Sequence, residues 1–258
     1  GVTVTSSSGR PRSVPSITIR GSRSISASNS PLYIIDGSVS SDVEFSMLNS
    51  DDIKSMEILK DAAAQSIYGA RASDGVILVT TKRGNAGEQV INYNGYIGVQ
   101  HLHRNFDFYS PEEWVGLRRE AVAHDMGYIE ATDVPIVTTL ADEVMQNIYK
   151  TGDFVDWEKL MFKDAAVYHN HELSFRGGSE RLKAAASLGY YNQDGLLRYN
   201  SGYERINGRV NLDFDVKKWL TVGINTSFAS TRKIQENGAF YQFITRPPLA
   251  RVKDEYGN

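Results

Sequence analysis

The sequence predicts a small α/β unit followed by the long antiparallel strands of a transmembrane β-barrel. About five segments alternate between apolar and polar residues over roughly ten to thirteen residues each, which is long for a soluble sheet. Polar or charged side chains occupy nearly every second position, as in "RINGRVNLDFDV" at residues 205–216. Long and short connections alternate between the segments, as extracellular loops and periplasmic turns do. The alternative is a soluble β-sandwich, or a sheet packed on the α/β unit.

The composition excludes several other classes of protein. Of 258 residues, 41% are hydrophobic and 23% are charged, which is the balance of a chain that folds. The net charge is -3 without a run of basic residues, so a nucleic-acid-binding surface is not indicated. No apolar run approaches the roughly 18 residues of a membrane helix. The absence of cysteine excludes disulfides, thiolate metal sites and cysteine nucleophiles.

The α/β unit is expected in about the first eighty residues, where short elements of different type follow one another. "PLYIIDG" is a compact strand that ends at the turn pair Asp36-Gly37, and "KSMEILK" has strand character. "DAAAQSIY" is a short helix with Gly69 after its end, and "GVILVTTK" is a buried strand. Candidate helix N-caps are Asn49, Ser50 and Asp51.

From Glu88 onward the sequence changes to long alternating strands. The first is "QVINYNGYIGVQ", and two more flank the tight "GGSE" turn in "HNHELSFRGGSERLKAAASLGYYNQDG". "RINGRVNLDFDV" and "LTVGINTSFAST" follow. Residues 104–166 form a connection in which we expect two helices. Ser110 and Glu113 predict a capping box at the start of one, and "LADEVMQNIYKTG" predicts the other, which ends on a glycine.

Three stretches resemble the SusC/RagA family of TonB-dependent outer-membrane transporters. "SITIRGSRSISASNSPLYIIDGSV" and "LNSDDIKSMEILKDAAAQSIYGARASDGVILVTTKRG" are similar to the family's plug domain. "FVDWEKLMFKDAAVYHNHELSFRGGSERLKAAASLGYYNQDG" is similar to its first barrel hairpin. The resemblance implies a plug domain at residues 1–86, then the first strands and extracellular loops of an incomplete barrel at residues 87–258. A complete barrel of this family has about 22 strands.

The resemblance also implies a function. Family members import a nutrient across the outer membrane of a Gram-negative cell, usually a glycan and sometimes a peptide, without a cofactor and without catalysis. The implied partners are a SusD-like surface lipoprotein, outer-membrane lipid, and TonB, which acts on the plug through an N-terminal segment that this chain lacks. About five strands cannot close a barrel, and an open edge leaves backbone groups unsatisfied in hydrocarbon. We therefore expect the chain to be the N-terminal portion of a longer polypeptide.

Candidate ligand-binding residues lie in one loop that the family's plug presents to its ligand. Their side chains offer hydrogen-bond donors and acceptors for sugar hydroxyls or a peptide backbone, although a solvated loop is the simpler interpretation. These candidates are Arg20, Ser22, Arg23, Ser24, Ser28 and Asn29.

A second group of residues is assigned to the architecture of the plug. The glycines of this group supply positive φ angles, and its arginine can pair with a carboxylate of the plug or of the inner barrel wall. The group consists of Asp36, Gly37, Tyr68, Gly69 and Arg71.

No metal site is predicted. Two histidine pairs have strand spacing, which is also a metal-ligand spacing, but both lie on apolar faces where imidazole suits a lipid–water interface. The pairs are His101 with His103 and His169 with His171. Asp51-Asp52 and Asp42 suggest calcium ligands, but a helix N-cap explains the Asp51-Asp52 pair more simply.

An enzyme is not predicted, because the paired carboxylates Glu112-Glu113 and Asp142-Glu143 lie on expected helices without a catalytic partner. The main alternative to a transporter is a β-rich surface module that binds glycan or protein without transporting it. A soluble hydrolase is a third class. The inner-face charges of the fourth strand are mixed in sign, so the sequence indicates no charge preference of the substrate.

Overall fold

The computed structural model describes residues 2–5, 16–19, 30–59, 67–72, 74–87, 89–103, 108–199, 201–235 and 246–250. The chain forms two compact units. The first comprises residues 1–99, 166–195 and 202–234, and the second comprises residues 100–165, 196–201 and 235–258. The candidate ligand loop, residues 20–29, lies outside the described residues.

The N-terminal α/β part of the first unit is built on a four-stranded sheet with the order β4-β3-β6-β5. Its strands are β3 (Leu32–Ile35), β4 (Ser38–Ser40), β5 (Ile53–Leu59) and β6 (Val76–Thr81). The central pair β3 and β6 is parallel, while β4 and β5 are antiparallel to their neighbours. Separate apolar clusters include Ile35 and Ile77 in one and Ile34 and Val76 in the other. Burial on both sides explains why "GVILVTTK" is apolar without alternation.

Short elements complete the α/β part. Strands β1 (Val2–Thr5) and β2 (Ser16–Ile19) pair as a two-stranded sheet. Helix α1 (Asp42–Met47) begins with a capping box of Ser41 and Glu44, which we did not predict. The expected N-caps at residues 49–51 begin only the single 3-10 turn η1 (Ser50–Asp52), and no side chain caps it. A second 3-10 turn, η2, spans Gly69–Ala72.

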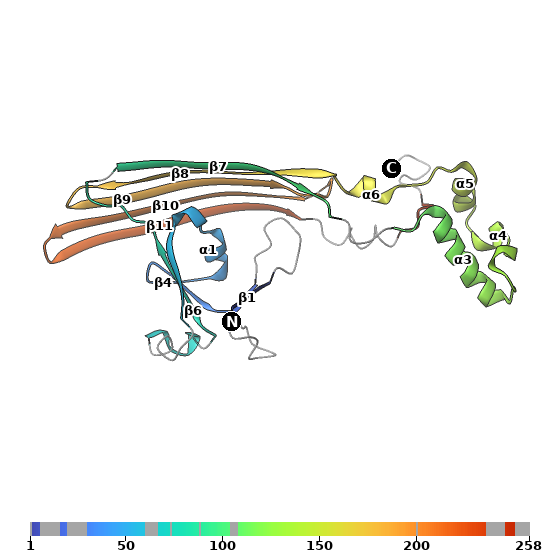
Figure 1. Ribbon diagram of the computed structural model, residues 1–258, viewed down its shortest axis with the longest axis horizontal. Helices are drawn as coiled ribbons and strands as arrows, with labels where there is room; N and C mark the ends of the chain where they lie inside the picture. The colour runs from blue at the N-terminus through green and yellow to red at the C-terminus, as the bar shows by residue number, and fades with distance from the viewer. Residues whose placement is uncertain are drawn as a thin grey trace. The chain divides into compact units, whose positions relative to one another are not determined.

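The long strands form one five-stranded sheet, in which each strand pairs with the next along the chain (Figure 1). They are β7 (Gln89–His101), β8 (Ala165–Gly178), β9 (Leu182–Asp194), β10 (Ser201–Lys217) and β11 (Leu220–Gln235). Strand β10 is longer than the predicted 205–216, because pairing with β9 continues to Gly202 opposite Asp194. Strands of 13 to 17 residues confirm the predicted long antiparallel sheet.

The second unit is helical. It contains α3 (Pro111–Met126), η3 (Ala131–Asp133), α4 (Ile136–Thr139), α5 (Glu143–Thr151) and α6 (Trp157–Met161). The predicted capping box of Ser110 and Glu113 begins α3, and α5 ends at Gly152 with φ 74°, so both expected helices are confirmed. Val115, Leu140, Ile148 and Leu249 form the unit's apolar core. Among the described helices, none combines the length and hydropathy needed to cross a membrane.

Candidate functional site

The two faces of β10 have opposite environments. Its polar side chains Arg205, Asn207 and Asn211 are only 2%, 6% and 2% exposed. Its apolar side chains Ile206 and Phe214 are 42% and 45% exposed. A water-soluble sheet buries its apolar face and exposes its polar face, so the burial of this strand is inverted. The arrangement is that of a barrel strand with lipid outside and a polar interior.

A buried ion pair joins the inner face of β10 to the α/β part. Nη1 of Arg209 lies 2.9 Å from Oδ2 of Asp36, and the two side chains are 11% and 5% exposed. The backbone N–H and the hydroxyl of Thr81 also donate to Asp36, at 2.9 and 2.6 Å. Asn211 in turn donates to the Thr81 hydroxyl at 3.2 Å. Because each member of this network satisfies another, removing one would leave a buried polar group without its partner.

The local sequence explains how Asp36 reaches this position. Asp36 and Gly37 form the two-residue turn between β3 and β4, and both have positive φ angles, of 48° and 86°. Aspartate tolerates this left-handed conformation better than most residues, and glycine adopts it freely. The predicted turn is therefore present. The ion pair itself was not predicted, although an acidic residue after a buried strand and an inward-facing arginine were the available signal.

Two further contacts extend along the same face of β10. Arg205 donates from Nη1 to the backbone oxygen of Ser46 in α1, at 3.1 Å. Arg83, which follows β6, forms an ion pair of 2.9 Å with Asp213, with side chains 40% and 20% exposed. The positive partner comes from the strand in the Asp36 pair and from the α/β part in the Arg83 pair. Strand β10 thus contacts the α/β part at three separate sites: Asp36, Ser46 and Arg83.

Strands β7 and β9 hold the turn η1. The hydroxyl of Ser187 donates to Asp52 at 2.7 Å, and the side-chain amide of Asn94 donates to Asp51. Burial raises the pKa of Asp52 above its ordinary value, and the bond from Ser187 and the charge of Arg209 partly offset this effect. The interpretation of Asp51-Asp52 as a helix N-cap is wrong, because both carboxylates accept hydrogen bonds from the long strands.

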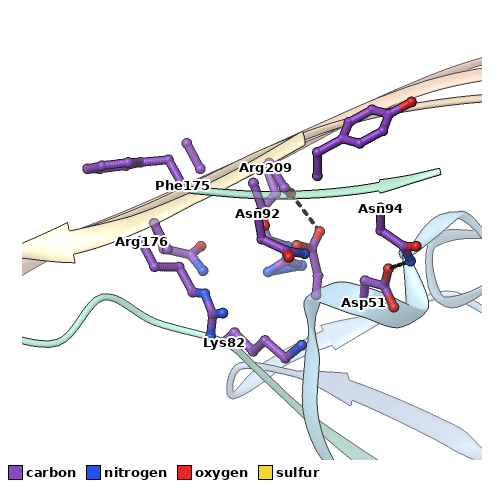
Figure 2. A pocket seen from close by; sticks show the side chains of 14 residues that line it. Asp51, Lys82, Asn92, Asn94, Phe175, Arg176 and Arg209 are labelled. Atoms are coloured by element: carbon purple, nitrogen blue, oxygen red, sulfur yellow. Dashed lines mark hydrogen bonds between the residues drawn. The ribbon is translucent and has the colours of Figure 1, made fainter. Parts of the chain in front are cut away.

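A polar pocket of about 240 Å³ lies beside these contacts. Figure 2 shows Asp51 facing Asn94 on one side of the pocket, with Lys82 and Arg176 on the other. Glu172 of β8 is 2% exposed, and neither of its carboxylate oxygens accepts a hydrogen bond from a described residue. The surface on which the α/β part meets the long strands therefore consists largely of polar and charged groups, whereas a protein core is mostly apolar.

A close backbone approach adds to the contact. A Cβ atom on Gly84 would overlap the carbonyl oxygens of Gly177 and Ala184, which belong to β8 and β9. Nearby, the N–H of Gly87 donates to the backbone oxygen of Gly178 at 3.1 Å. The segment after β6 requires a glycine here, because any side chain would push it away from the long sheet.

The structure places the remaining architectural candidates within the α/β part. Tyr68 packs against the cluster that contains Ile34 and Val76. Gly69 has the predicted positive φ, at 69°. Arg71 is exposed, and no described carboxylate forms an ion pair with it. Its predicted pairing is therefore not observed among the described residues.

The histidines lie among aromatic rings. The ring of His171 forms a hydrogen bond of 2.7 Å between Nδ1 and the hydroxyl of Tyr93, and the rings of His169 and Tyr190 lie 5.7 Å apart. In the described part of the chain, no group of three or more histidine or acidic residues is arranged to hold a metal ion. The suspected carboxylate pairs are structural, since Glu113 caps α3 and Asp142 caps α5.

Comparison with known proteins supports the interpretation of both parts of the first unit. The family described as TonB-dependent Receptor Plug Domain matches residues 1–76. TonB-dependent receptor P26 of Formosa agariphila is 34% identical over 264 residues, covering 100% of this chain and 25% of its own length. TonB-dependent receptor SusC of Bacteroides thetaiotaomicron is 34% identical over 222 residues, covering 82% of this chain and 20% of its own.

Solved structures give the same result. The structure of the RagAB peptide transporter matches with a TM-score of 0.79 and 29% identity, covering 100% of this chain and 31% of that chain. The ferric enterobactin receptor PfeA matches with a TM-score of 0.53 and 14% identity, which shows the fold alone.

The α/β part is the plug domain of a TonB-dependent receptor, and the long sheet is an unclosed set of its barrel strands. Within this class, the chain belongs to the SusC/RagA family of TonB-dependent transporters, whose members are outer-membrane proteins of Gram-negative bacteria and are not enzymes. It spans a fifth to a quarter of the curated relatives described above.

Proposed function

We propose that this chain is part of an outer-membrane importer that takes up a glycan or oligosaccharide by TonB-driven rearrangement of its plug. The plug would occupy residues 1–86 and the barrel portion residues 87–258. The proposed partners are a SusD-like surface lipoprotein outside and TonB inside, with a peptide as the second candidate substrate. The loop at residues 20–29 remains the proposed ligand contact of the plug.

The single observation that carries the proposal is the inverted burial of β10. Its polar face lies against the plug through Arg205, Arg209 and Asp213, while Ile206 and Phe214 point outward. A strand with apolar side chains outside and a polar lumen suits a membrane, and a plug in that lumen suits gated passage.

The chemistry of the contact also supports movement of the plug. When the two surfaces separate, their hydrogen bonds and ion pairs are exchanged for hydrogen bonds to water. Exposing an apolar surface of the same area would instead cost free energy in proportion to that area. The contacts of Asp36, Asp52 and Arg83 with the strands would hold the plug at rest. TonB would supply the work that breaks them.

The test locks the plug to the barrel strands. The side chains of Asp52 and Ser187 are joined by a 2.7 Å hydrogen bond, and both residues are replaced, as Asp52→Cys and Ser187→Cys. The 258 residues contain no cysteine of their own. Source cells carrying the variant are treated with a short, reducible thiol cross-linker. Growth is then measured on purified polysaccharides and on a casein digest as carbon sources.

We expect the cross-linked cells to lose growth on at least one polysaccharide and to regain it after reduction. Each single-cysteine variant, treated with the same reagent, should grow normally. Undiminished growth with a fully cross-linked plug would contradict transport by plug rearrangement. If the cells bind the polysaccharide but never depend on the protein for growth on it, the non-transporting binding module is the correct interpretation.

A further inference from the structure

The helical unit contains a cleft of its own, and none of its lining residues takes part in the contacts between plug and strands. The cleft has a volume of about 600 Å³, within the roughly 300–1,000 Å³ of small-molecule sites. Trp114, Leu117, Arg118 and Ala121 of α3 form one wall. Their spacing places them on one face of the helix. Residues at the start of α6 and around residues 246–248 form the other walls.

Helix α3 has two apolar faces, one in the core of the unit and one along the cleft, and Trp114 contributes to both. Val115 is 2% exposed and faces the core with Leu140 and Ile148. In the cleft, Leu117 is 44% exposed and Tyr109, just before the helix, is 63% exposed. Aromatic and apolar surface left open in a concave site favours a bound ligand over a purely structural role.

Charged groups of both signs line the cleft. They are Arg118, Arg246, Asp156 and Glu158, and Asp156 also caps α6 and pairs with Lys159 at 3.3 Å. Arg118 lies over the ring of Trp114, 5.2 Å from its centroid, and donates from Nε to the backbone oxygen of Thr139. A site with both signs of charge does not select an anion or a cation. It offers donors and acceptors to an uncharged ligand with many hydroxyl groups.

We propose that this cleft binds an uncharged oligosaccharide. The apolar C–H face of a sugar ring would stack on the exposed ring of Tyr109, since aromatic faces present extended apolar surface with partial negative charge. The hydroxyl groups would bond to the carboxylate of Glu158 and the guanidinium of Arg246. A peptide bound by strand addition does not fit, because none of the lining residues belongs to a strand whose edge could pair with an extended backbone.

This proposal rests on the proposed import function only for its biological use, because binding can be measured without TonB. The experiment uses the native protein, purified from the outer membrane of its source cell in detergent. Isothermal titration calorimetry measures the binding of maltohexaose, cellohexaose, xylohexaose and mannohexaose, and of a casein digest as the peptide probe. The variants are Tyr109→Ala and Glu158→Gln, and the control is Tyr128→Ala.

We expect at least one hexasaccharide to bind and Tyr109→Ala to weaken its affinity about tenfold or more. Tyr128 is 39% exposed and does not line the cleft, so Tyr128→Ala should leave the affinity unchanged. Glu158→Gln keeps the side-chain shape and should also weaken binding. Because Tyr109 is exposed, its replacement leaves the fold intact.

The proposal is overturned if no hexasaccharide binds. It is overturned as well if Tyr109→Ala and Glu158→Gln both bind the sugar with the affinity of the native protein. It is also overturned if the casein digest competes for the cleft and the sugars do not. These outcomes are independent of transport. Sugar binding that needs Tyr109 in a protein that imports nothing would refute the proposed function alone, and import without any effect of Tyr109→Ala would refute the cleft alone.

Discussion

The barrel strands and the helical unit bury opposite kinds of side chain. The helical unit buries Leu140 and Leu249 completely, as a domain in water does. Strand β10 buries Arg205 and Asn211 and exposes Phe214. One chain therefore follows two burial rules: apolar side chains lie inside the helical unit, whereas β10 has polar side chains inside and apolar side chains outside, as a membrane barrel strand does.

The largest expected effect comes from breaking the buried ion pair of the polar interior. Arg209→Met leaves the carboxylate of Asp36 buried without its charged partner, which should lower the free energy of unfolding by about 3–5 kcal/mol. Urea unfolding in phospholipid vesicles measures this loss. Arg71→Met, at an exposed arginine without a described ion pair, should change the value by less than about 0.5 kcal/mol.

The double variant Asp36→Asn with Arg209→Met sharpens this test. Because it removes both charges, it should recover part of the loss of the single variant. If Arg209→Met costs no more than Arg71→Met, the ion pair does not hold the plug.

The next effect tests the apolar core of the helical unit. Leu140 is 0% exposed, and Leu140→Ala should destabilise the unit by about 2–5 kcal/mol, because it creates a cavity. Hydrogen exchange of the α3 amides measures this change. Leu173→Ala removes the same atoms from the outer face of β8, where the side chain is 51% exposed, and should leave α3 protection unchanged. Equal effects would mean that the helical unit has no independent core.

A charge on each region's exposed surface separates lipid from water. Val210→Arg, on the outer face of β10, should cost about 2–4 kcal/mol if the residue lies near the middle of the bilayer. Val137→Arg, on the exposed surface of α4, should change stability by less than about 0.5 kcal/mol. Unfolding in vesicles gives both values. If Val210→Arg costs no more stability than Val137→Arg, the long strands form a soluble sheet and not part of a membrane barrel.

The smallest effect is the pH dependence of α3. Hydrogen bonds from the backbone and side chain of Ser110 hold the pKa of Glu113 below its ordinary value. The ionised carboxylate therefore adds stability above that ordinary value, and the contribution is lost as the pH falls through the lowered pKa. Hydrogen exchange of the first turn of α3 at several acidic pH values should show this loss. Glu113→Ala should abolish it, while the neighbouring variant Glu112→Ala should retain it.

Much of the fold could be predicted because its signals are local. Alternation along β10 is a property of one segment, since successive side chains of any strand point to opposite faces. The Ser110 and Glu113 capping box and the Asp36-Gly37 turn also need only a few neighbouring residues. Helix α1 was missed although Ser41 and Glu44 carry the same capping signal, because the segment is short and has no clear apolar period.

The candidate site was predicted less completely, because its contacts join distant parts of the chain. Asp36 and Arg209 are separated by 173 positions, and Asp52 and Ser187 by 135. From the sequence, Asp36 was assigned to a turn and Asp52 to a helix cap. Neither assignment named the distant side chain that its carboxylate binds. Many charged residues of either sign were available as partners, and local pattern does not choose among them.

The sequence by itself determined the kind of element at most described positions, and which face of each long strand is apolar. It also indicated the family, through three stretches that resemble the plug domain and the first barrel hairpin of its members. The tertiary structure alone decided which polar groups meet: Asp36 with Arg209, Arg83 with Asp213, and Gly84 against the backbone of β8 and β9. The physical reason is that secondary structure follows local periodicity and steric limits, whereas an ion pair between plug and barrel forms only after both parts have folded and packed together.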